Sequence, residues 1–158
     1  MTLFRDSNSD LMKILNILSK DETKINKITK NLVKYCEKDN NKIIVCGNGG
    51  SATDADHFVT ELVVRFKKNK RKSLSSMSLS SNAGLITAAG NDLGFKNIFK
   101  RQLESLALKN DCVLFISTSG NSENLIEAAK YLKKKKIFSI ALLGSGGGKL
   151  KKICDQFY

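Results

Sequence analysis

The single histidine of the chain, His57, lies four residues before Glu61. If this segment is helical, the two side chains share one face, because residues i and i+4 are neighbours on a helix. Such a pair could supply two ligands to a zinc ion, or it could place a general base beside a partner group. A His–Glu contact on a helix surface with no role is the alternative. The position of the pair, expected in the second turn of a helix after a glycine-rich stretch, favours chemistry.

That glycine-rich stretch is Gly47 to Ser51 (GNGGS), and it follows a short apolar segment. Glycine lets a backbone approach a ligand closely, and the N–H groups at a helix start favour an anion. The four residues from Ser51 to Asp54 have the spacing of a capping box, with Asp in place of the usual Glu or Gln. We therefore expect a phosphate-binding loop here, with an ordinary tight turn and helix cap as the simpler alternative.

A second polar loop, Ser117 to Ser122 (STSGNS), follows another apolar segment and precedes a second helical pattern. Its four hydroxyl groups and the free N–H groups of the helix start could surround a phosphate without any lysine. Taken alone, such a cluster is also ordinary loop and cap chemistry. Two such loops at the ends of neighbouring strands are more specific evidence for a phosphate site than either loop alone. Asn91 and Asp92, expected in a loop after a helix over 83–89, could add hydrogen bonds to sugar hydroxyls.

Other phosphate-binding motifs fit less well. A P-loop needs a Lys followed by Ser or Thr after its glycines, and no such pair follows Gly50. Gly47, Gly49 and Ala52 match the dinucleotide-binding pattern, but the expected second strand ends without the acidic residue that would hold a ribose. The sequence thus favours a sugar phosphate over a nicotinamide cofactor.

The elements that must position these loops alternate along the chain. Apolar residues at helical spacing predict two amphipathic N-terminal helices within 8–38. Short apolar runs predict strands at 42–46, 75–79, 112–117 and 137–143, with helices between them over 52–66, 83–89, 95–106 and 123–135. Continuous apolar strands alternating with helices are typical of an α/β fold whose parallel sheet is covered on both faces. In such sheets, ligands bind at the carboxyl ends of the strands, where both polar loops lie.

Composition narrows the function classes. The net charge of +12 is concentrated in Lys67 to Lys72 and Lys133 to Lys136, so we considered a polyanionic partner. A solvated lysine-rich surface is the simpler explanation, and the 7% aromatic content with no Trp argues against a single-strand nucleic-acid platform. The four cysteines lack zinc-finger or CxxC spacing and are expected to be buried thiols of a reducing compartment. With no signal peptide and no long apolar run, we expect a cytoplasmic protein without membrane contact.

Three segments together resemble the sedoheptulose 7-phosphate isomerases, also called phosphoheptose isomerases, of the SIS-domain superfamily. They are CGNGGSATDADHFVTEL, AAGNDLGF and FISTSGNSENLIEAAKYLKKKKIFSIALLGSGGGKL. The resemblance covers nearly the whole chain and implies one SIS domain over 1–158, with N-terminal helices at 8–38 and a Rossmann-like sheet domain at 42–158. It also implies a homotetramer with sites at subunit interfaces, and an isomerase that makes heptose 7-phosphate for lipopolysaccharide or capsule.

The resemblance further assigns roles by position. Glu61 would be the catalytic base that moves a proton through an enediol, and His57 and Glu61 would bind zinc. The substrate would be held by Asn48, Gly49, Gly50, Ser51, Asn91, Asp92, Ser117, Thr118, Ser119 and Ser122.

Two questions stay open at the level of sequence. Family members continue beyond the equivalent of Tyr158 into a strand and a helix that carry a Gln and a His of the metal and acid–base site. We therefore expect the final strand and helix to be missing here, in a fragment or in a natural truncation of reduced activity. The other function considered is a non-enzymatic SIS-domain protein that binds sugar phosphates or regulates a replication initiator. Direct DNA binding is a weaker third interpretation.

Overall fold

A computed structural model of the chain describes residues 2–38, 40–67, 70–144 and 146–158. Its centre is a parallel sheet in the order β2-β1-β3-β4-β5. The strands are β1 (Ile43–Cys46), β2 (Ser76–Ser78), β3 (Cys112–Ser117), β4 (Phe138–Leu143) and β5 (Gln156–Phe157). The expected α/β fold with a parallel sheet is confirmed.

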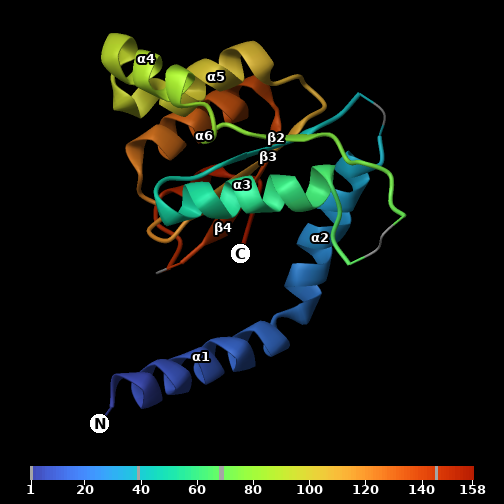
Figure 1. Cartoon of the computed structure of the whole chain (residues 1–158), viewed down its shortest axis with the longest axis vertical. Coiled ribbons are helices and arrows are strands. Elements are labelled where there is room, and N and C mark those ends of the chain that lie inside the picture. The colour runs from blue at the N-terminus through green and yellow to red at the C-terminus, as the bar shows by residue number, and fades with distance from the viewer. Residues whose placement is uncertain (1, 39, 68–69, 145) are drawn as a thin grey trace.

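Helices cover both faces of this sheet (Figure 1). Helices α2 and α3 lie on one face, and α4, α5 and α6 lie together on the other. The helical segments are α1 (Leu3–Lys20), α2 (Glu22–Cys36), α3 (Gly50–Val63), α4 (Ala83–Leu93), η1 (Phe95–Asn97), α5 (Ile98–Leu106), α6 (Glu123–Lys135) and α7 (Leu150–Ile153).

The central strand β1 shows why both faces are covered. All four of its residues are fully buried, and successive side chains of a strand point to opposite faces. Ile44 and Cys46 therefore pack with α4, α5 and α6, whereas Ile43 and Val45 pack with α2 and α3. A continuous apolar strand of this kind needs two helical layers.

A buried carboxylate holds together the amino-terminal edge of the sheet, which is the edge away from the two polar loops. Asp111, which precedes β3, is fully buried and accepts hydrogen bonds from the backbone N–H groups of Lys42 (3.0 Å) and Leu108 (2.7 Å). The ammonium group of Lys42 donates to the same carboxylate at 2.7 Å. One side chain thus holds the starts of β1 and β3 side by side.

The end of the chain corrects one expectation. We expected the final strand of the sheet to be missing, but Gln156 and Phe157 form β5 and pair in parallel with Ile140 and Ala141 of β4. Asp155 supports this pairing, since its carboxylate accepts hydrogen bonds from the N–H (2.8 Å) and the hydroxyl (3.0 Å) of Ser139.

The cysteines are free thiols, and three of them, Cys46, Cys112 and Cys154, are buried. Burial raises the pKa of Cys112 and of Cys154 to about 12, so these thiols stay protonated at neutral pH. Cys36 is half-buried at the end of α2. None of the helices among the described residues has the length and apolar composition that a membrane span requires.

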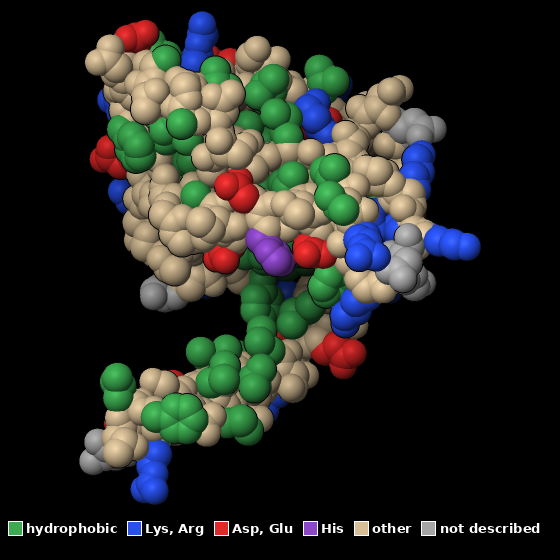
Figure 2. Space-filling model, in the orientation of Figure 1, with side chains coloured by type: hydrophobic (Ala, Val, Ile, Leu, Met, Phe, Trp, Pro, Cys, Tyr) green, Lys and Arg blue, Asp and Glu red, His purple; other side chains and the backbone are tan. Residues whose placement is uncertain are grey.

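Helix α1 differs from all of this, because none of its 18 residues is buried. It projects away from the sheet domain (Figure 1), and Figure 2 shows hydrophobic side chains gathered along it. At the junction of α1 with α2, the hydroxyl of Tyr158 donates to the carboxylate of Asp21 at 3.4 Å, and the ammonium of Lys24, in α2, lies 4.4 Å from the ring centre of Phe157. The large apolar side chains exposed on α1 are Leu3, Phe4, Leu11, Met12, Ile14, Leu15 and Ile17.

Candidate functional site

The first glycine-rich loop leaves β1 and leads directly into α3. Gly49, at φ +54°, is the N-cap of α3, a backbone conformation that favours glycine. The loop is clamped by Ser80, which follows β2: its hydroxyl donates to the carbonyl of Gly47 at 3.0 Å and accepts from the Gly47 N–H at 3.3 Å. The expected capping box is wrong, because Ser51 lies inside the helix and makes no cap.

The second polar loop leaves β3 and leads into α6. Ser117 is buried, and its hydroxyl accepts a hydrogen bond from the N–H of Gly120 at 3.0 Å. Ser119 folds the loop further by accepting from the N–H of Asn121 at 3.2 Å. Thr118 and Ser119 are exposed, and Ser122 is the N-cap of α6. The first N–H groups of a helix lack acceptors within it, so the start of α6 leaves backbone donors beside these hydroxyl groups.

The two loops are joined by a pair of asparagines. The Asn48 amide donates to Oδ1 of Asn124 at 2.9 Å, and the Asn124 amide donates back to Oδ1 of Asn48 at 2.8 Å. Asn48 lies in the first loop and Asn124 in the first turn of α6, 76 positions further along the chain. Asn124 was not among the predicted site residues, because nothing in its immediate neighbourhood distinguishes it from an ordinary polar residue at a helix start.

A third glycine-rich segment, after β4, supports the second loop from the other side. The N–H groups of Leu150 and Lys149 donate to the carbonyl of Gly120 (3.0 Å) and to the side chain of Asn121 (3.1 Å). A Cβ atom on Gly120 would overlap the carbonyl of Gly147, and one on Gly148 would overlap that of Ser119. The second loop is therefore held on both sides by its neighbours at the carboxyl edge of the sheet.

His57 and Glu61 do share a face of α3, as predicted. Their closest polar atoms, Nε2 and Oε1, lie 3.6 Å apart, with His57 76% and Glu61 31% exposed. Because α3 begins at Gly50, Glu61 lies in its fourth turn and not its second, about 16 Å along the helix axis from the glycine loop. Glu61 and the first glycine-rich loop therefore lie at opposite ends of α3.

As donors, an imidazole nitrogen and a carboxylate oxygen suit zinc, which takes four ligands in most protein sites. Within the residues that the structure describes, no group of three or more His, Cys, Asp or Glu side chains gathers around one point. Among the described residues, His57 and Glu61 on α3 could therefore supply two ligands to a zinc ion.

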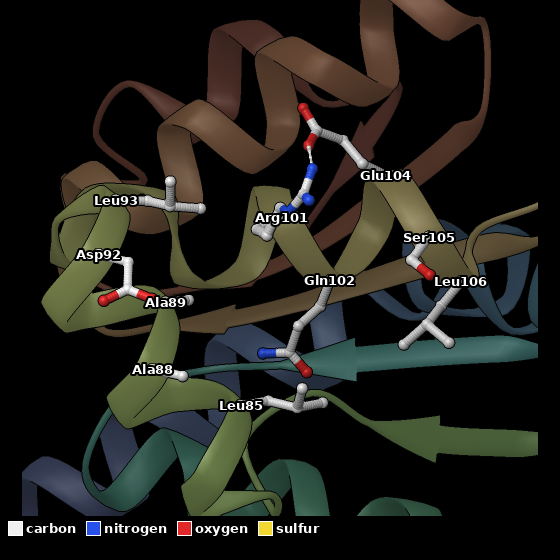
Figure 3. Close-up of a pocket in the computed structure, with 10 residues that line it drawn as sticks. All are labelled: Leu85, Ala88, Ala89, Asp92, Leu93, Arg101, Gln102, Glu104, Ser105 and Leu106. Carbon is white, nitrogen blue, oxygen red and sulfur yellow. Dashed lines mark hydrogen bonds and ion pairs between the residues drawn. The ribbon is translucent and has the colours of Figure 1, made fainter.

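Asn91 and Asp92 lie somewhere other than expected. Helix α4 passes through Gly90 and ends before Gly94, so both residues belong to its last turn and not to a loop. The Asn91 amide donates to the Asp92 carboxylate at 2.7 Å. Figure 3 shows Asp92 lining a cleft between α4 and α5 together with Leu85, Leu93 and Gln102.

This cleft has a volume of about 760 Å³, and its other polar lining includes Arg101 and Glu104, which form an ion pair at 3.3 Å (Figure 3). None of the residues of the two polar loops lines it. The structure thus brings the two loops together and pairs His57 with Glu61, but it gives Asp92 surroundings of its own.

The two lysine-rich runs lie away from these loops in sequence. Lys133–Lys136 ends α6, where cations complement the helix dipole as expected. In the other run, Lys68 and Asn69 lie outside the described residues, and the guanidinium of Arg71 donates to the carbonyl of Glu61 at 2.6 Å.

Comparison with known proteins agrees with this geometry. The family model described as SIS domain matches residues 6–144. A phosphoheptose isomerase of Nitratiruptor is 51% identical over 118 residues, which cover 75% of this chain and 63% of that relative. The chain thus spans less than two thirds of the length of this relative.

Two solved structures cover more of the chain. The phosphoheptose isomerases of Neisseria gonorrhoeae and Francisella tularensis match 98% of this chain and 82% of their own chains, at 33% and 31% identity. The TM-scores are 0.80 and 0.84. The chain belongs to the phosphoheptose isomerase family of SIS-domain proteins.

Proposed function

We propose that this chain carries the substrate-binding loops and the proton-transferring carboxylate of an isomerase acting on sedoheptulose 7-phosphate. The product is D-glycero-D-manno-heptose 7-phosphate. The observation that carries this proposal is the joining of the two polar loops through Asn48 and Asn124, at the start of the helix that presents His57 and Glu61. Family membership and the isomerase names of the relatives support it.

The phosphate would be held at the second loop, by the hydroxyl groups of Thr118, Ser119 and Ser122 and by N–H groups at the start of α6, with Ser117 shaping the loop from below. Asn48, Gly49, Gly50 and Ser51 would contact the sugar from the first loop. Asn91 and Asp92 would reach sugar hydroxyls only from the cleft edge of α4, where the structure has them. Binding energy gained at the phosphate then orients reacting carbons that lie far from it.

Glu61 would act as the base at those remote carbons. Aldose–ketose exchange moves a proton from the carbon next to the carbonyl to the neighbouring carbon, through an enediol. One carboxylate can accept the proton from one carbon and return it to the other, because the two adjacent carbons of a planar enediol present the same face to it, while the hydroxyl proton passes between the two neighbouring oxygens. In a seven-carbon sugar 7-phosphate, the reacting carbons and the phosphate lie at opposite ends of the molecule.

We further propose a zinc ion held in part by His57 and Glu61, whose donor atoms suit it. When bound, such an ion stabilises negative charge on oxygen. Its remaining ligands would lie outside the described residues of this chain.

The proposed assembly is a homotetramer with sites between subunits, and the uncovered apolar face of α1 supports it. The proposed setting is the cytoplasm, in the synthesis of heptose for lipopolysaccharide or capsule, and the free thiols fit a reducing compartment.

Substitution of Glu61 by Gln tests the proposal. Removing a general base of this kind costs on the order of 10²- to 10⁴-fold in turnover. We expect that loss for sedoheptulose 7-phosphate, measured by product sugar analysis, while calorimetry shows unchanged binding of the sugar phosphate. Glu22→Gln on the exposed surface of α2 is the matched control.

Full turnover by Glu61→Gln would contradict the mechanism. Sugar-phosphate binding by the unsubstituted protein without any turnover, with and without added zinc, would favour the non-enzymatic binder.

A further inference from the structure

The contact between Asn48 and Asn124 differs from the other polar contacts at this edge of the sheet. Asn124 is 2% exposed, although it lies in the first turn of a helix whose other first-turn polar residue, Glu123, is exposed. Its amide makes three hydrogen bonds: Nδ2 donates to Asn48, and Oδ1 accepts from Asn48 and from the N–H of Leu125 at 2.9 Å. A buried amide with these partners is a specific structural device.

The chemistry of the pair explains why both residues are asparagines. Two primary amides facing each other exchange two hydrogen bonds, because each has one donor and one acceptor on adjacent atoms. A carboxylate at either position has no donor, and an apolar side chain at either position removes both hydrogen bonds of the pair, so that the partner's NH2 group loses its acceptor. An unsatisfied buried polar group of that kind costs more than an ordinary hydrogen bond contributes.

The position of the pair matters more than its stability. Asn48 belongs to the loop after β1 and Asn124 to the helix after β3, so the two hydrogen bonds set the distance between the two loops. On the far side of the second loop, Leu150 and Lys149 hold Gly120 and Asn121 through backbone donors. On the side that faces the first loop, the second loop and the start of α6 are held by the amide pair of Asn48 and Asn124.

We propose that Asn124 is a positioning residue that fixes the first glycine-rich loop relative to the phosphate-binding loop, so that one sugar phosphate can contact both at once. Asn124 itself touches no substrate in this proposal. The proposal rests on the proposed function for its ligand, sedoheptulose 7-phosphate, but the joining of the loops can be measured without any ligand.

Asn124→Asp is the main test, because the side chain keeps its size and loses its donor. We expect sedoheptulose 7-phosphate to bind on the order of tenfold more weakly by calorimetry, since one hydrogen bond becomes a clash of two acceptors. KM should rise by a similar factor, with kcat changed much less. Asn26→Asp, the same change at an exposed position of α2, should leave binding as it is.

A cycle with Asn48→Ala separates positioning from general destabilisation. Asn124→Ala should weaken binding by about tenfold on its own and by less than about twofold when Asn48 is already alanine, because the contact is then absent. Equal effects in both backgrounds would overturn the proposal. Unchanged affinity in Asn124→Asp, with only a lower melting temperature, would overturn it as well.

Hydrogen exchange without ligand keeps this test separate from that of the function. In Asn124→Asp, backbone amides of residues 47–51 should exchange faster than in the unsubstituted protein, while those of α5 should not change. If the unsubstituted protein does not bind the sugar phosphate, the proposed function fails, and the exchange result still decides whether Asn124 joins the loops. Unchanged exchange at 47–51 would contradict the joining itself.

Discussion

The carboxyl edge of the sheet and helix α1 differ in how far their side chains are packed against the rest of the chain. At the sheet edge, three loops hold one another through short hydrogen bonds and through glycines that admit no side chain. Helix α1 has comparable regularity, yet it leaves Phe4 78% and Leu11 52% exposed. At the sheet edge the contacts form within one chain, whereas the apolar side chains of α1 are left exposed.

This contrast separates two kinds of stability in one molecule. The sheet and its loops should unfold together, because their contacts join segments far apart in sequence. Helix α1 contributes little to that transition, since packing of an apolar face supplies most of the stability of helices in proteins. Substitutions in the two regions should therefore differ sharply in effect.

The largest difference is expected between two aspartates that both pair with lysine. Asp111→Ala removes a buried carboxylate that serves two backbone N–H groups and Lys42, and should lower the free energy of unfolding by about 3 kcal/mol or more. Asp10→Ala removes an exposed pair with Lys13 on α1 and should cost less than about 1 kcal/mol. Urea denaturation measures both, and similar losses would refute the contrast.

The next largest difference, about 2 kcal/mol, is expected between two glycines near the sheet edge. In Gly120→Ala, backbone strain at φ +62° adds to overlap with the carbonyl of Gly147, for a loss of about 3 kcal/mol and weaker phosphate binding. Gly146→Ala is the matched control, because its φ of +81° carries strain without any overlap and should cost about 1 kcal/mol. Thermal unfolding with and without inorganic phosphate distinguishes them. Equal losses would show that the loops have room to separate.

The smallest effect on unfolding is expected on α1, where the consequence is association. Leu11→Glu combined with Leu15→Glu should change the free energy of unfolding of the single chain by less than about 1 kcal/mol, because both side chains are exposed. The same pair should shift sedimentation towards smaller species at equal concentration. Ser9→Glu with Asn16→Glu, on the opposite face, should not. An unchanged assembly in the first variant would mean that α1 is not the interface.

The fold could be predicted from the sequence because its signals are local. The strands are unbroken apolar runs in the sequence, and the helices between them show apolar residues at helical spacing. The order of strands and helices along the chain could therefore be predicted directly. The predicted end of α4, at residue 89, was too early, because the sequence alone does not show which of Gly90 and Gly94 ends the helix. Gly94 adopts φ +81° and ends the helix, whereas Gly90 stays helical.

The site could be predicted only as far as its parts are contiguous. The two polar loops and the His57–Glu61 pair lie each within a short stretch, so spacing was enough to find them. Asn124 was missed because its importance comes from Asn48, a residue 76 positions away that only the sheet order brings near. Asp92 contacts Asn91, its neighbour in the sequence, as a local pattern would suggest. It also lines the cleft against α5, and no local sequence pattern predicts that cleft.

The register of the sheet also determines how long β1 remains without its partner β3 while the chain is being synthesised. Ile43 of β1 pairs with Cys112 of β3, so the most buried strand waits for a partner that is synthesised 69 residues later. At ribosomal rates of roughly 5 to 20 residues per second, that wait is about 3 to 14 seconds. During synthesis, β1 can pair with β2 on one side, but its other edge stays unpaired until β3 has been made, and an unpaired apolar strand edge favours aggregation. The central strand of the sheet thus stays open to aggregation on one side for the length of that wait.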